Sequence, residues 1–91
     1  MQLPPKQLDE ADVLCWAVSE SGGFHQLGGS DPAVTILAMA VARYANGGPF
    51  YLFKCGSDWE VHQDCESVEV AQQLAASHTT EALRWRTWDV P

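Results

Sequence analysis

The sequence predicts an α+β fold with two N-terminal helices, a β-hairpin, a third helix and a short C-terminal strand that completes a three-stranded antiparallel sheet. Three observations predict this fold. Apolar residues recur at helical spacing through the first half of the chain, apolar and polar residues alternate near residue 60, and turn-forming residues separate the segments. A chain of 91 residues has the length of one domain, and we assign residues 1–91 to it.

Two segments of the first half are predicted to be helices. Asp9 is a suitable N-cap for the first, over residues 10–20, whose apolar side chains share one face. The pair Asp31-Pro32 is a typical helix start and predicts the second helix, which runs to residue 45. Because this second segment is apolar on nearly every face, we expect it to be central and covered on more than one side.

The second half is predicted to contain the hairpin, the third helix and the last strand. The aromatic residues 50–55 and the alternating residues 59–65 form the hairpin, and residues 68–77 form the helix. Residues 82–88 alternate and are predicted as a strand. A right-handed crossover places this strand beside the first strand of the hairpin, in the sheet order 2-1-3. A short helix that begins at residues 80–83 is the alternative.

The charge of the chain restricts its partners. Twelve acidic and five basic residues give a net charge of −7. Nucleic acids and anionic membranes bind proteins through Lys and Arg, so this balance argues against both. It favours another protein with a basic surface.

Three further features predict a cytoplasmic protein. No apolar run approaches the ~20 residues that a membrane-spanning helix needs, and the first residues lack the charged and apolar regions of a signal peptide. The three cysteines are an odd number, which favours free thiols in a reducing compartment.

The second predicted hairpin strand carries a series of polar residues at alternate positions. They are Asp58, Glu60, His62, Asp64 and Glu66. Strict alternation puts all of them on one face over roughly 26 Å, at the usual rise of a strand. One interpretation is a solvated outer face that discourages aggregation. The other is a docking surface, on which carboxylates meet the Lys and Arg residues of a partner.

The cysteines and histidines do not match the spacing of a zinc site. Cys55, His62 and Cys65 are close in sequence but form no paired unit of zinc-binding type. In a hairpin, His62 is expected to point away from Cys65, and the two cysteines are expected at opposite ends. We therefore predict no metal and no cofactor.

Thiol catalysis is a further possibility. It requires a base beside a cysteine, and the candidates are Cys15 with His25 or His78. No local signature supports the pairing, and Cys15 is expected on the apolar face of the first helix as a small buried hydrophobe. We therefore predict that the chain is not an enzyme.

The C-terminal residues combine arginine and tryptophan, which are enriched at interface hot spots. Alternation places Trp85 in the core. Trp88 lies in the opposite phase, and we expect it to be an exposed partner contact.

One region resembles a known class of proteins. It comprises Tyr51-Leu52-Phe53-Lys54-Cys55, then Trp59-Glu60-Val61, then a capped helix with Val68, Ala71 and Leu74. This pattern, over residues 50–77, resembles small acidic bacterial proteins of the toxin-immunity type. The resemblance implies a protein that neutralises a toxin, and no site residue is carried over from it.

Together these observations predict a non-catalytic protein-binding domain. Its sharpest form is an inhibitor or immunity protein that masks the active site of a partner toxin or enzyme through an acidic and aromatic surface. The alternative is a small structural or adaptor subunit that self-associates through the second predicted helix or the edge of the last strand.

Overall fold

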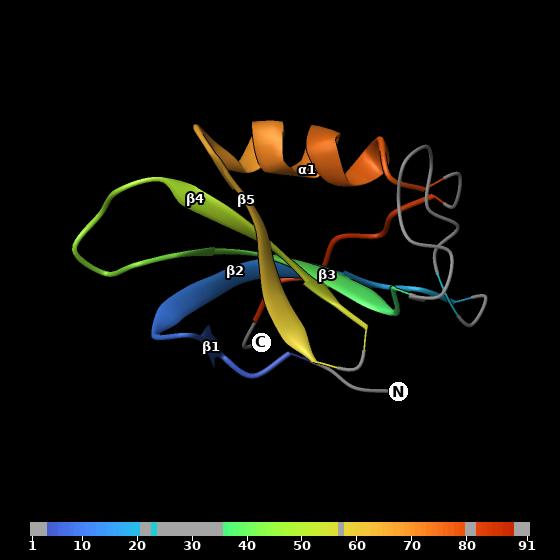
Figure 1. The fold of residues 1–91 in the computed structure, drawn as a ribbon, viewed down its shortest axis with the longest axis horizontal. Coiled ribbons are helices and arrows are strands. Elements are labelled where there is room, and N and C mark those ends of the chain that lie inside the picture. Colours follow the sequence, from blue (N-terminus) through green and yellow to red (C-terminus); the bar gives the residue numbers. More distant parts are fainter. Residues whose placement is uncertain (1–3, 21–22, 24–35, 57, 80–81, 89–91) are drawn as a thin grey trace.

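The computed structural model describes residues 4–20, 23, 36–56, 58–79 and 82–88, and these residues form a curled antiparallel sheet with one helix (Figure 1). The elements are β1 (Gln7–Leu8), β2 (Ala11–Val18), β3 (Ala38–Arg43), β4 (Phe50–Cys55), β5 (Trp59–Cys65) and α1 (Val68–Ala76). The five strands follow one another in the order β1-β2-β3-β4-β5. The predicted fold class, with two N-terminal helices and a three-stranded sheet, is therefore wrong.

The segment predicted as the first helix is the strand β2. Its pairing with β3 shifts between Val13 and Cys15, so that Leu14 forms a β-bulge. Val13 and Trp16 therefore face the same side of the sheet although they are three residues apart. A bulge thus reproduces the spacing of an amphipathic helix, which explains the wrong prediction.

The segment predicted as the second helix contains the strand β3, and residues 24–35 lie outside the described residues. β3 is buried on both faces along five of its six residues. A strand of this kind gives a continuous apolar run, which periodicity does not distinguish from a buried helix. The expectation that this segment is central is met by a strand that lies between β2 and β4.

The hairpin β4–β5 and the helix α1 lie where the sequence predicts them. The side chain of Ser67 caps α1 by accepting a hydrogen bond from the Val70 backbone N–H at 3.1 Å. α1 covers one face of the sheet, over β3, β4 and β5 (Figure 1). Its buried residues are the small Ala71 and Ala75, which allow a close approach to the strands.

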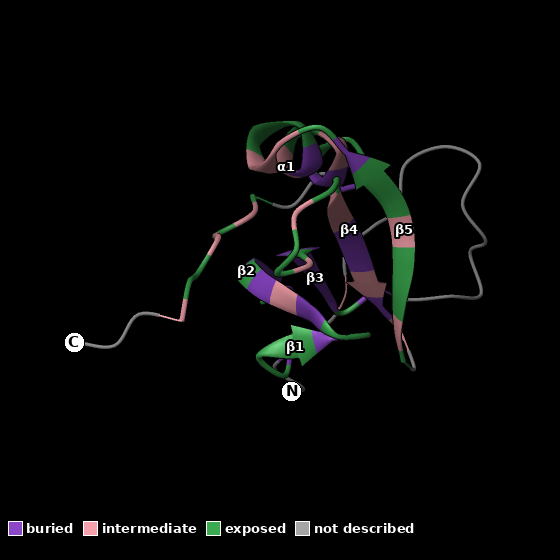
Figure 2. Ribbon diagram, turned by 90° about the vertical axis from the view of Figure 1, so that its left-hand side faces the viewer, coloured by how far each residue is buried: buried purple, intermediate pink, exposed green. Residues whose placement is uncertain are grey.

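The core consists of two clusters, one on each face of the sheet. The helix-side cluster has the buried members Cys15, Ile36, Met39, Val41, Leu52, Cys65, Ala71 and Ala75. The aromatic cluster on the opposite face has the buried members Leu8, Ala11, Val13, Trp16, Ala40, Ala42 and Phe53, and Tyr44, Tyr51, Trp59 and Trp88 pack against it. Figure 2 shows that burial is concentrated in the middle strands, whereas β5 is largely exposed.

Residues 82–88 are neither the predicted third strand nor the alternative helix. Their one bridge joins Arg86 to Trp16 of β2, through backbone hydrogen bonds of 2.9 and 2.7 Å. The predicted sheet order 2-1-3 is wrong because β3 already occupies the side of β4 that the last strand would need. The C-terminal segment instead lies against the edge of β2.

Candidate functional site

The candidate site is the outer edge of the sheet, formed by β5. Within the described residues, β5 pairs only with β4, so the backbone groups of its other edge are open. The carboxylates of the predicted stripe are all exposed: Asp58, Glu60, Asp64 and Glu66. In the part of the chain that the structure describes, none of these four forms an ion pair, and the one ion pair joins Arg84 to Glu20 at 3.8 Å.

A β-bulge divides the acidic residues of β5 between the two faces of the sheet. The register passes from Phe53 opposite Val61 to Leu52 opposite Gln63, which leaves His62 without a partner on β4. Glu60 is opposite Lys54, whereas Asp64 is opposite Tyr51 of the aromatic face.

The predicted single acidic face is therefore wrong. The carboxylates of β5 flank the edge on both sides, because the extra residue reverses the phase of the alternation. The alternation in the sequence continues through the bulge and gives no sign of it.

The bulge brings His62 to His78, a contact that sequence reasoning missed. The Nε2 atoms of the two imidazoles are 2.9 Å apart, and the rings meet edge to face with centroids 4.5 Å apart. Burial lowers the pKa of His62 below its ordinary value of 6.5, and the nearby positive charges of His78 and Lys54 act in the same direction. The pair joins the edge strand to the end of α1.

The three cysteines are free thiols, and all of them are buried. Burial raises the pKa of Cys15, Cys55 and Cys65 above the ordinary value. The thiolate is the reactive form, so this shift opposes catalysis at neutral pH.

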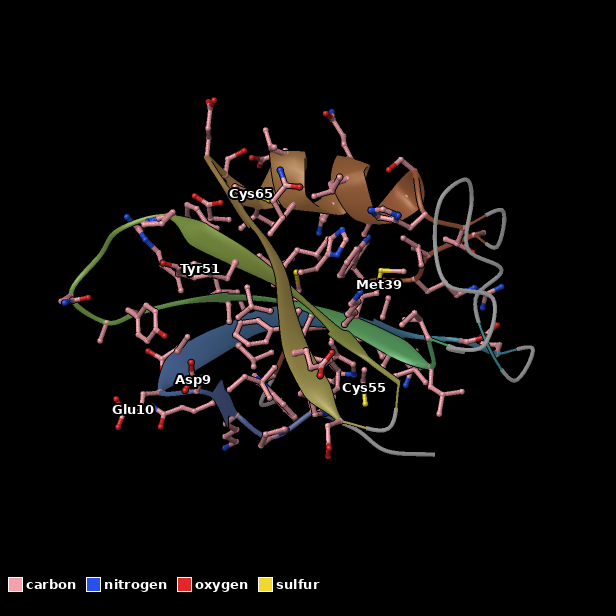
Figure 3. All side chains as sticks on the ribbon, in the orientation of Figure 1. Asp9, Glu10, Met39, Tyr51, Cys55 and Cys65 are labelled. Carbon is pink, nitrogen blue, oxygen red and sulfur yellow. The ribbon has the colours of Figure 1, made fainter. Side chains whose placement is uncertain are left out.

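The surroundings of the cysteines also differ from those of a catalytic pair. Cys15 lies in β2, and its Sγ atom accepts a hydrogen bond from Gln72 Nε2 at 3.6 Å, while His78 contacts His62. His25 lies outside the described residues. Cys55 and Cys65 are at opposite ends of the β4–β5 hairpin, as the sequence predicts (Figure 3).

Trp88 is half-buried, whereas the sequence predicts that it is exposed. Its ring lies against Trp16 of β2, with centroids 4.1 Å apart and planes inclined at 33°. The structure therefore places Trp88 on the aromatic cluster, where Trp59 also packs. The indole N–H groups of all three tryptophans are buried and meet no acceptor among the described residues. Trp85 packs, half-buried, against the helix-side cluster.

Comparison of the chain with protein-family models, with curated proteins and with solved structures found no match. Among the described residues, no helix has the length and apolar character needed to cross a membrane.

Proposed function

We propose that this chain is a non-catalytic protein-binding domain that docks a basic partner along the edge strand β5. The observation that carries the proposal is the exposed edge of a seven-residue strand, which no described residue pairs with and which has carboxylates on both of its sides. An extended segment of a partner is able to pair with the backbone of such an edge. Lys and Arg side chains of that segment would then meet carboxylates above and below the sheet.

The chemistry of β5 favours a charged partner over a second copy of the same chain. Two β5 edges would bring like charges together, and charge with a bulge is the usual protection of an edge against self-pairing. Two seams were possible for a self-associating subunit: the edge of a C-terminal strand, which residues 82–88 do not form, and the second predicted helix. That segment contains β3, whose two faces are covered within the chain.

The sharpest form of the proposal is an inhibitor or immunity protein for a basic enzyme. It is supported by the net charge of −7 and by the buried, high-pKa thiols, which leave binding as the better-supported role. Acidic surfaces suit targets whose active sites hold phosphate, because they speed encounter and compete for the same positive charges. Free cysteines also favour a cytoplasmic setting.

The test is charge reversal on β5 with a control of equal charge. Asp58, Glu60 and Asp64 are replaced together by Lys, and tagged chains are used to capture proteins from the native host. The control replaces Glu10, Asp12 and Glu20 by Lys, away from β5. We expect that the wild type and the control capture the same host proteins and that the β5 variant no longer captures them. Equal loss in both variants would show that only net charge matters and would contradict docking at β5.

A further inference from the structure

We propose that His62 and His78 form a chelating site for a transition-metal ion that prefers square-planar or octahedral coordination, of the Ni²⁺ or Cu²⁺ type. The two Nε2 atoms are 2.9 Å apart and come from two different elements, the bulge of β5 and the segment directly after α1. Imidazole nitrogen is a common ligand of both ions. The bulge positions one ligand, and the end of the helix positions the other.

The distance between the nitrogens selects the type of ion. If each nitrogen lies at about 2.0–2.1 Å from the metal, as imidazole ligands usually do, a separation of 2.9 Å gives an angle of about 90° at the metal. Neighbouring ligands make this angle in square-planar and octahedral complexes. A tetrahedral ion such as Zn²⁺ needs a wider angle, so the nitrogens would have to move apart.

The orientation of the rings is compatible with chelation. The ring centroids are 4.5 Å apart. If both rings lay along the line through the two nitrogens, the centroids would be farther apart than this. The two rings are therefore not both aligned with the line that joins the nitrogens, which is consistent with two ligands of one ion. The ring planes are nearly perpendicular, at 89°.

The surroundings of the pair also permit a cation. Both imidazoles are half-buried, and neutral imidazole is the form that binds metals. Lys54 opposes a cation, but Glu60 is its direct neighbour across the strands. No group of three or more His, Cys, Asp or Glu residues that could hold a metal occurs among the described residues. The pair therefore leaves coordination positions for water or for a ligand from a partner.

The site is tested by calorimetric titration of the whole chain with NiCl₂ and, separately, with ZnCl₂ near pH 7.5. The variants His62→Gln and His78→Gln each remove one ligand, and His25→Gln is the matched control. We expect one Ni²⁺ per chain in the wild type and the control, and binding at least about tenfold weaker in either pair variant. Ni²⁺ is expected to bind more tightly than Zn²⁺.

Two results would overturn the proposal. The first is the absence of Ni²⁺ binding at millimolar metal, which would leave the contact as a hydrogen bond alone. The second is Ni²⁺ binding that neither pair variant weakens. Should a variant fail to fold, NMR of the wild type decides, since paramagnetic Ni²⁺ must broaden the signals of His62 and His78 first. Broadening that begins elsewhere contradicts the site.

Discussion

Replacing Glu10 by glycine is expected to stabilise the protein, because Glu10 occupies a backbone conformation that suits glycine. Leu8 is paired with Ala11, so Asp9 and Glu10 form a two-residue loop between β1 and β2. Their φ angles are 50° and 70°, which is the pattern of a type I′ turn. Asparagine or aspartate followed by glycine is the preferred sequence of that turn, and this chain has only the first half of it.

The size of the effect follows from two opposing costs. A residue other than glycine in the left-handed region costs about 1–2 kcal/mol. The greater freedom of glycine in the unfolded chain costs about 0.5–1 kcal/mol. The midpoints of these two ranges predict an increase in the free energy of unfolding of about 0.5–1 kcal/mol. For a domain of this size, the melting temperature should then rise by roughly 2–8 °C.

The assay is thermal and urea unfolding of the wild type, Glu10→Gly and Glu10→Ala. Alanine removes the same charge and keeps the Cβ atom that makes positive φ unfavourable, so it should give no comparable gain. Figure 3 shows Glu10 at the outer end of the β1–β2 turn. If Glu10→Ala stabilises the protein as much as Glu10→Gly does, the gain comes from the lost charge and the reasoning from the backbone is refuted.

Four further predictions follow from the core, the helix cap, the histidine pair and the thiols. Leu52→Ala, at a side chain only 1% exposed, should lower the free energy of unfolding by about 3–5 kcal/mol in urea titrations, whereas the exposed Leu14→Ala should change it by less than about 0.5 kcal/mol. Ser67→Ala should cost about 1 kcal/mol in the same assay, and Ser67→Asn should restore most of it. The lowered pKa of His62 means that the unfolded chain binds a proton at this residue more readily than the folded chain does. His62 therefore stabilises the fold above pH 6.5, and this stabilisation is lost as the pH falls below that value. The urea midpoints of the wild type and His62→Gln should converge between about pH 7.5 and 5, and parallel curves would contradict this. The three buried cysteines should react with a thiol reagent at pH 7 only as fast as the protein unfolds, and rapid labelling of the native chain would contradict their raised pKa values.

The hairpin and the helix of the second half were predictable because their signals are local. β4 and β5 have strand-forming residues on either side of a glycine-containing turn, and Ser67 lies directly before an amphipathic segment. The strands β2 and β3 were not predictable from the sequence, because the patterns of their residues depend on tertiary structure. The bulge at Leu14 gives β2 the spacing of a helix, and β3 is apolar because the sheet is covered on both faces.

The candidate site was predictable in part for the same reason. That the carboxylates in β5 and directly beside it are exposed follows from the pattern of the strand, and the structure agrees for Asp58, Glu60, Asp64 and Glu66. Their directions depend on a bulge whose position no residue type announces. The contact between His62 and His78 joins residues on different elements, so no local spacing could reveal it.

The bridge between Arg86 and Trp16 has a consequence for the order of events during synthesis. Trp16 leaves the ribosome early, yet the segment that covers its strand edge and ring is among the last described residues to be made. While β3, β4 and β5 emerge, the growing sheet therefore presents the part of the β2 edge that β1 does not pair, beside an uncovered indole. Such intermediates attract chaperones and misdirected strand pairing. Pulse-labelled nascent chains that stop before residue 85 should accordingly be the forms that associate most with chaperones.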